Sequence, residues 1–352
     1  MNGNTVFVLG LGGALYSLLF WGFRKLPAET WQIAACIPGN RMADGRWSGL
    51  NLTWYGFFTA TAYVLAVAVM LVLMASVGVT PPLTVCMVLA VLIVCVPASR
   101  MIATWVEGKR HTFTVGGASF VGMLAAPWVV LMAGAGSERL LGRPVDVMAV
   151  LAAMSISYAL GEGIGRLACI SFGCCYGRPL SDVPPLVRKI LGPFRFTFRG
   201  ETKKIAYAHG LEGCPVVPVQ GMTSLLYTTA GLIGILLFLD GHGTAAFLLT
   251  LSVTQVWRVL SEFLRADYRG GQSFSAYQVM ALAGVCYGLC LAFLFAAEAP
   301  PGRADILAGL EALWQPSMIL FLQALWTVLM VLTGRSSVTA SHISIHVLKD
   351  RI

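Results

Sequence analysis

Long apolar stretches separated by short polar segments run along most of this chain. A helix needs about 20 apolar residues to cross the hydrocarbon of a bilayer. Nine stretches meet or approach this length, the third and fifth being short: residues 5–23, 52–77, 83–98, 118–135, 145–160, 220–240, 244–264, 276–297 and 317–333. Strand-type alternation is absent, and the unbroken apolar runs exclude an outer-membrane barrel. The pattern predicts an all-α integral membrane protein, a polytopic bundle of about eight or nine transmembrane helices with a small extramembrane head.

Composition agrees with this class. Hydrophobic residues make up 57% of the chain and charged residues 11%, which is typical of an integral membrane protein. The N-terminal sequence MNGNTVFVLG has neither the basic region nor the cleavage site of a signal peptide, so we expect the first segment to be retained. A net charge of +8 favours anionic lipid head groups as partners, and no nucleic-acid motif is present.

Two segments between the apolar stretches are long enough to form structure outside the membrane. In segment 24–49, Pro27, Pro38 and Gly39 predict short pieces of interfacial structure. Segment 177–218 is basic, and its alternation in FRFTFRG, followed by TKKIAYAHG, predicts a small hairpin.

Three charged residues lie in or beside the apolar stretch 244–264. Arg258, Glu262 and Arg265 are spaced i, i+4, i+7, so they project from one face of a helix. A charge at membrane depth is costly and needs a partner or a polar cavity. Two arginines around one glutamate leave a net positive charge, which suits a lipid phosphate. The alternative is an Arg258–Glu262 ion pair that only locks two helices together.

A second group follows the fifth stretch, in GEGIGRLACISFGCCYGRP. Glu162 and Arg166 are again i, i+4, among glycines that allow either close helix contact or a break. Cys169, Cys174 and Cys175 come next. Their spacing lacks the C-x2-C pairs of zinc sites and no histidine is near in sequence, so no metal is expected. Apolar packing, a disulfide involving Cys169 or Cys214, and reactive thiols remain open.

The order of these elements resembles that of the prolipoprotein diacylglyceryl transferases, which move a diacylglyceryl group from phosphatidylglycerol onto a lipobox cysteine. The resemblance covers residues 52–297 and rests on WYG at 54–56, Ala-Ser-Arg at 98–100, GGASFVG at 116–122, GEGIGR at 161–166, Pro-x-Gln at 218–220, RVLSEFLR at 258–265 and SAYQ at 275–278. It divides the chain into an extra N-terminal part (1–50), a transferase-like core (51–297, with the head insertion 177–218) and an extra C-terminal span and tail (298–352).

The resemblance implies that six residues match family residues that bind phosphatidylglycerol or catalyse its transfer: Tyr55, Arg100, Arg166, Arg258, Glu262 and Arg265. Gln220 and Glu162 complete the set of candidate site residues. The expected catalytic residues are Arg166, Arg258 and Glu262; the expected substrate-binding residues are Tyr55, Arg100, Arg265, Gln220 and Glu162. Read without the resemblance, Tyr55 would be an aromatic anchor at the membrane interface, and Arg100 an arginine that snorkels. No cofactor is expected. The partners implied are an anionic phospholipid and a lipoprotein precursor, and the implied location is the bacterial cytoplasmic (inner) membrane.

The chain departs from the family at polar residues of the half of the site that would handle the acceptor cysteine. Family histidines are replaced by Val121 and Val217, and the signature's two asparagines and its glutamate by Cys169, Phe172 and Cys174. The arginines that would hold phosphate persist. Two hypotheses follow: a phosphatidylglycerol-dependent diacylglyceryl transferase, or a non-catalytic phospholipid-binding membrane scaffold derived from that family. A transporter is a third reading, but no inverted repeat is present.

The basic loops and the resemblance disagree about topology. Segments 24–49 and 177–218 fall on the same side, which the positive-inside rule places in the cytoplasm. The resemblance places this side outside. We follow the resemblance, because arginines that bind lipid phosphate at span ends are not topogenic charges.

Overall fold

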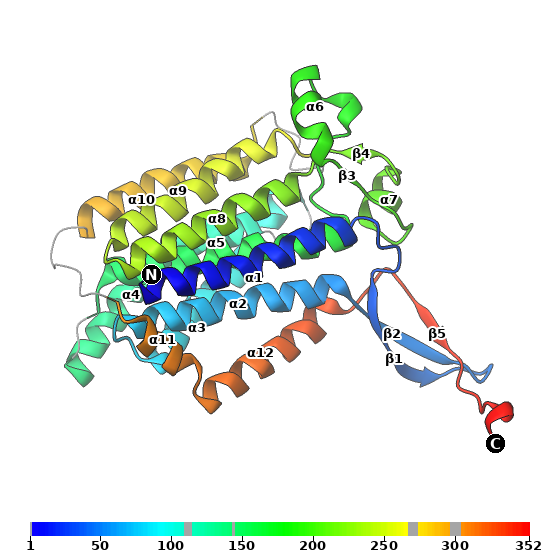
Figure 1. The fold of residues 1–352 in the computed structure, drawn as a ribbon, viewed down its shortest axis with the longest axis horizontal. Helices are drawn as coiled ribbons and strands as arrows, with labels where there is room; N and C mark the ends of the chain where they lie inside the picture. Colours follow the sequence, from blue (N-terminus) through cyan, green and yellow to red (C-terminus); the bar gives the residue numbers. More distant parts are fainter. Residues whose placement is uncertain (1, 109–114, 143–144, 267–273, 296–303) are drawn as a thin grey trace.

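The computed structural model describes residues 2–108, 115–142, 145–266, 274–295 and 304–352. In these ranges most of the chain forms helices that run side by side (Figure 1). Nine of the helices described are long and apolar enough to cross a membrane: α1 (Gly3–Lys25), α2 (Trp54–Ser76), α3 (Pro81–Glu107), α4 (Val115–Leu141), α5 (Val147–Phe172), α8 (Val219–Leu239), α9 (Gly243–Glu262), α10 (Ala276–Phe295) and α12 (Pro316–Gly334). The predicted helical membrane bundle is confirmed.

The two stretches predicted to be short belong to helices of full spanning length. Helix α3 has 27 residues and continues through Pro97 past Arg100. Helix α5 has 26 residues and continues through the whole of GEGIGR until Gly173, whose φ of 67° ends it. The apolar pattern stops early in both because polar residues enter, whereas the backbone hydrogen bonds of a helix continue regardless of side-chain polarity.

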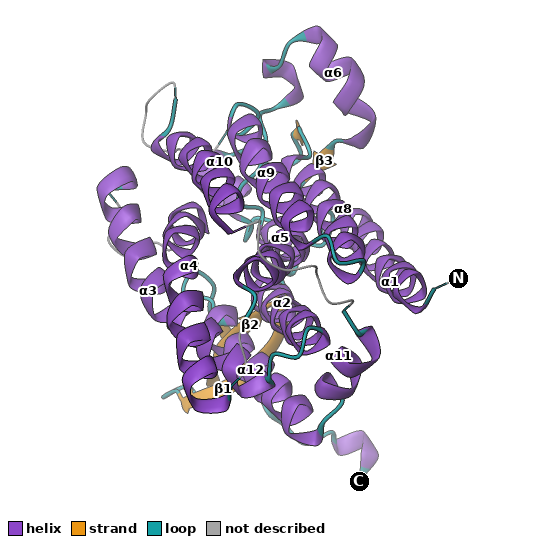
Figure 2. Ribbon diagram, turned by 90° about the vertical axis from the view of Figure 1, so that its left-hand side faces the viewer, coloured by secondary structure: helices purple, strands orange, loops and turns teal. Residues whose placement is uncertain are grey.

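Helix α5 lies at the centre of the bundle and packs against α2, α8 and α9 (Figure 2). Its glycines allow close contact. A Cβ added at Gly161 would lie 2.9 Å from the Cβ of Ala66 on α2, and one added at Gly163 would lie 2.9 Å from the Thr228 hydroxyl oxygen on α8. The glycines of GEGIGR therefore serve close helix packing, and α5 is not broken there.

A small head follows α5. It contains α6 (Pro185–Leu191), α7 (Lys204–His209) and the strands β3 (Phe196–Thr197) and β4 (Pro215–Val216), which pair antiparallel. The predicted hairpin is wrong in its second half, because TKKIAYAHG contributes α7 instead of a strand. Gly210, at a φ of 63°, supplies the left-handed cap that ends this short helix.

The parts before and after the transferase-like core meet in a three-stranded sheet. Strand β1 (Ile33–Arg41) pairs with β2 (Trp47–Thr53), and β2 pairs with β5 (Ser341–Ile343) near the C-terminus. The interfacial structure expected in segment 24–49 is therefore mostly a hairpin. A short helix that the sequence did not predict, α11 (Ile306–Leu313), packs on α2. The proposed three-part division of the chain stays a prediction.

The sheet and the head lie at the same end of the bundle, which we call the head end (Figure 1). The C-terminal ends of α1 and α5 and the N-terminal ends of α2 and α8 are found there. After α9 the chain returns to the segment that follows α5, since Arg178 N–H donates to the Leu264 carbonyl and Ala266 N–H to the Tyr176 carbonyl. The ends of α5 and α9 are thereby held together.

Candidate active site

The central helix presents one polar face near the head end. Tyr158, Glu162 and Arg166 follow one another at i, i+4 spacing on α5 and so share a face. Arg166 lies six residues before Phe172, which is about 9 Å from the end of the helix at a rise of about 1.5 Å per residue. Arg258 lies four residues before the end of α9, about 6 Å by the same measure. Both arginines therefore lie within about two turns of the head-end termini of their helices.

Glu162 connects the two arginines. Its carboxylate accepts hydrogen bonds from Tyr158 and Arg166 and, at 2.9 Å, from Nη2 of Arg258. Arg258 also donates to the Tyr158 hydroxyl. The side chains are 6% (Glu162), 15% (Arg166) and 12% (Arg258) exposed. One buried carboxylate thus lies between two buried guanidiniums, and the group, which we call the arginine cluster, carries a net positive charge.

The arginine cluster has unused donors. The Nε atoms of Arg166 and Arg258 are buried and have no hydrogen-bond partner among the described residues. Gly116, in the GGASFVG element of α4, leaves room beside Arg258: a Cβ there would lie 3.1 Å from Nη1. Buried unsatisfied donors are costly, and a guanidinium binds phosphate through such N–H groups. The cluster therefore has both the charge and the spare donors for an anion.

Two other predicted residues follow on α9 and just beyond it. Glu262 is half-buried at the last position of the helix, and Arg265 is half-buried three residues later. Arg265 lies close enough to Arg166 for the two positive charges to interact. Arg258 is paired with Glu162 from another helix, so its ion pair joins α9 to α5.

Tyr55 and Gln220 lie beside the segment that follows α5. The ring of Tyr55, at the start of α2, packs edge-on against Phe172 with 5.5 Å between ring centroids. Nε2 of Gln220, at the start of α8, donates to the Cys174 carbonyl at 2.9 Å. Arg100 differs: it is exposed on α3, and among the described residues its side chain makes no ion pair or hydrogen bond with the arginine cluster.

Tyr158 was not predicted as a site residue. It is partly buried on α5 and contacts both Glu162 and Arg258 through its hydroxyl. Its position one turn before Glu162, on the same face as Arg166, is the signal that could have found it.

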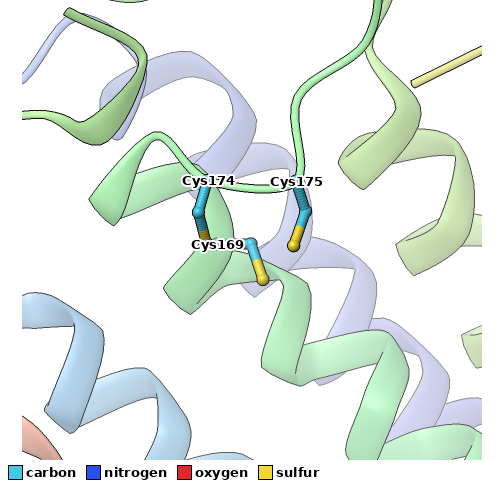
Figure 3. Close-up of side chains that lie close together, drawn as sticks. All are labelled: Cys169, Cys174 and Cys175. Carbon is cyan, nitrogen blue, oxygen red and sulfur yellow. The ribbon is translucent and has the colours of Figure 1, made fainter. Parts of the chain in front are cut away.

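The three cysteines after GEGIGR come together in space (Figure 3). Cys169 is in the last turn of α5, Cys174 and Cys175 follow its end, and the three sulfur atoms all lie within 4.8 Å of one another. Cys169 and Cys174 are free thiols. The hydrogen bonds with Cys169 and Cys175, together with burial, raise the pKa of the Cys174 thiol well above its ordinary value. Arg166 and Tyr55 both lie near enough to these sulfurs for electrostatic interaction.

A buried lysine fixes the head to the bundle. Lys203 is 0% exposed, and its ammonium group donates to the carbonyls of Leu26 and Ser171 at 3.0 Å and 2.7 Å. Burial lowers the pKa of Lys203 to about 8. The head is thus tied to the ends of α1 and α5.

A family model described as prolipoprotein diacylglyceryl transferase matches residues 46–294, which is more than half of the chain and includes both the arginine cluster and the three cysteines. No curated protein matches the chain.

Proposed function

This chain belongs to the prolipoprotein diacylglyceryl transferase family, and we propose that it transfers a diacylglyceryl group from phosphatidylglycerol, or a similar anionic phospholipid, to a cysteine thiol of a protein in lipoprotein biogenesis. The family membership and the multi-pass helical bundle are compatible with a reaction at the surface of a bilayer. We place the enzyme in the bacterial cytoplasmic (inner) membrane, with a lipoprotein precursor as its second substrate.

The observation that carries this proposal is the arginine cluster. Arg166 and Arg258 share the single carboxylate of Glu162, so one positive charge is left over. In the proposed reaction a thiolate attacks the glyceryl carbon, and the phosphate oxygen leaves with the bonding electrons. The phosphate then gains a negative charge. Guanidinium groups already in place in a poorly solvated site stabilise that charge better than water does.

The remaining predicted residues have roles that follow from their positions. Arg265, near Arg166, adds a positive charge toward the head end. Tyr55 and Gln220 line the segment that contains the three cysteines, where the acceptor would enter. We assign Glu162 the role of orienting the two arginines. Glu262 is kept as a candidate catalytic residue because it ends the helix that carries Arg258.

The test uses the full-length chain in proteoliposomes that contain labelled phosphatidylglycerol, with a lipobox peptide as acceptor. We expect the mass of the peptide to increase by one diacylglyceryl group. Arg166→Gln and Arg258→Gln should each abolish transfer, because each removes a charge-assisted contact worth about 1.5–3 kcal/mol even before catalytic effects. Arg139→Gln is the matched control, since Arg139 is exposed near the end of α4, away from the head end. Transfer that persists in both cluster variants would refute the role given to the arginines.

One observation favours a second candidate, a phospholipid-binding scaffold without catalysis. Val217, which replaces a family histidine, is fully buried and packs with Leu180, Val183 and Val219. A polar acceptor-side group is therefore replaced there by an apolar contact. Binding of phosphatidylglycerol by the wild-type chain, with no modified peptide for any acceptor thiol offered, would support the scaffold over the enzyme.

A further inference from the structure

The three cysteines have a geometry that their spacing in sequence does not suggest. Two consecutive residues in extended chain point to opposite sides, yet Cys174 and Cys175 both turn their sulfurs toward Cys169 (Figure 3). This arrangement depends on the backbone. Gly173 has a φ of 67°, and Cys175 has a φ of 54°, in the left-handed region that non-glycine residues seldom adopt. A residue held in this region beside a cluster of thiols motivates a hypothesis of function.

The distances fit a thiolate-bound metal ion. With a Zn–S bond of about 2.3 Å, two sulfur ligands of a tetrahedral zinc ion lie about 3.8 Å apart. The three sulfurs, all within 4.8 Å of one another, reach that geometry with side-chain movements of less than about 1 Å. Sulfur ligands select soft or borderline ions such as Zn²⁺. Three thiolates would leave a net negative charge on such a site, and Arg166 beside Cys169 and Cys175 offsets it.

We propose that Cys169, Cys174 and Cys175 bind a zinc-like divalent cation whose fourth coordination position is open to the thiol of the acceptor protein. This inference rests on the proposed function and deepens it. Catalytic zinc sites have three protein ligands and one position for water or substrate, unlike closed structural sites. Cys169 and Cys175 are only partly buried, so the cluster is accessible to an incoming group.

A metal ion at this cluster would give the site a means to deprotonate the acceptor thiol. The reacting species must be the thiolate. Glu162 is the carboxylate of the arginine cluster, but it is already shared by two guanidiniums and is a poor base for that reason. A thiol that coordinates a metal ion loses its proton outright, and no separate base is then required.

The step balances without an oxidant or reductant. On coordination the acceptor S–H loses its proton to water. The sulfur then forms a bond to the glyceryl carbon, while the bond between that carbon and the phosphate oxygen breaks. The electron pair leaves with glycerol phosphate, whose additional negative charge lies beside Arg166 and Arg258. The product thioether is a weaker ligand than the thiolate, so the modified protein can dissociate.

The first experiment measures metal content. The full-length chain is purified in detergent without chelators, and its zinc is determined by mass spectrometry; a parallel sample is titrated with Co²⁺, whose thiolate complexes have a charge-transfer absorption. We expect about one zinc ion per chain. Cys169→Ser, Cys174→Ser and Cys175→Ser should each lower the affinity for Co²⁺ in this titration by at least about tenfold, the minimum effect of losing even an outer-shell partner. Cys214→Ser, another partly buried free thiol of the head, is the matched control.

The second experiment separates this proposal from the proposed function. The cysteine variants should lose transfer and keep phosphatidylglycerol binding, whereas Arg258→Gln should lose phosphatidylglycerol binding and keep its zinc. If the wild-type chain binds zinc at the cluster but neither it nor any variant transfers a diacylglyceryl group, the proposed function and the acceptor role are refuted, and the metal site stands. Transfer by a chain that binds neither zinc nor Co²⁺ would overturn the metal site alone. Two of the three thiols found as a reducible disulfide in the active protein would also overturn it.

Discussion

Replacing Glu162 with glutamine is expected to destabilise the protein and, at the same time, to make it depend on anionic lipid. The substitution keeps the shape of the side chain and removes its charge. Arg166 and Arg258, 15% and 12% exposed, would then face each other without a counter-charge. Breaking a buried ion pair by removal of one partner costs about 3–5 kcal/mol. Because the glutamine oxygen still accepts a hydrogen bond, we expect a loss near the lower limit, about 3 kcal/mol.

A lipid phosphate can take the place of the missing carboxylate. A ligand that binds only the folded state stabilises it by about 2.7 kcal/mol at a concentration of about 100 times its Kd. Phosphatidylglycerol should therefore restore most of the stability that Glu162→Gln loses, whereas zwitterionic phosphatidylcholine should not. The wild-type chain should gain less from phosphatidylglycerol, because Glu162 already neutralises one of its two guanidiniums.

The assay is the fraction of detergent-solubilised protein that stays monodisperse after heating, measured with and without each lipid. Glu138→Gln is the matched control, since Glu138 is exposed near the end of α4. The double variant Glu162→Gln/Arg258→Gln should be more stable than Glu162→Gln alone, because it removes one of the two facing charges; residues in one network are not additive. If Glu162→Gln and the control Glu138→Gln lose monodispersity at the same temperature, the reasoning is refuted. Equal stabilisation of Glu162→Gln by phosphatidylglycerol and phosphatidylcholine would also refute it.

Three further predictions test other parts of the structure. Gly56→Val should displace α12 from α2 at a cost of about 1–3 kcal/mol, because a Cβ at Gly56 would lie 2.1 Å from the Cα of Gly334. The control in the same heating assay is Gly13→Val, because a Cβ at Gly13 would have nothing within 4 Å. The pKa of Lys203 is lowered to about 8 from 10.5, so between these pH values the folded protein binds fewer protons than the unfolded one. Its stability should therefore rise as the pH increases from 8 to 10.5. Lys203→Met should abolish that rise. A cysteine at Lys189, exposed on α6, should react with a membrane-impermeant thiol reagent on intact cells if the head is extracytoplasmic, and labelling only after permeabilisation would reverse the topology.

Helices could be predicted from the sequence because a spanning helix has a simple requirement, about 20 apolar residues in succession. Their ends could not, since α3 and α5 continue through polar residues that serve the site. The head was harder still. Its segments are short, and whether residues 204–209 form a strand or a helix depends on the cap at Gly210 and on burial of Ile205, neither of which alternation reveals.

The contacts of the candidate site that lie within one helix could be predicted from the sequence. The i, i+4 spacing of Glu162 and Arg166 correctly placed both on one face of α5. Spacing along α9 offered Glu262 as the partner of Arg258, but the partner that the structure shows across the helix interface is Glu162. Such partners depend on which helices pack together. The sulfur cluster was missed for a related reason, since it depends on two left-handed backbone positions, at Gly173 and Cys175.

The arrangement of donor and acceptor groups along α5 favours the transferase over the scaffold. Arg166 and Cys169 are three residues apart on the helix, so their side chains are neighbours, about 5–6 Å apart at Cβ. A phosphate held by Arg166 and a thiolate held at Cys169 would thus be about one helical turn apart. The glyceryl carbon to be attacked is bonded directly to a phosphate oxygen. Binding a lipid requires only the first of these groups, whereas a transfer reaction requires both, held near each other by one rigid element.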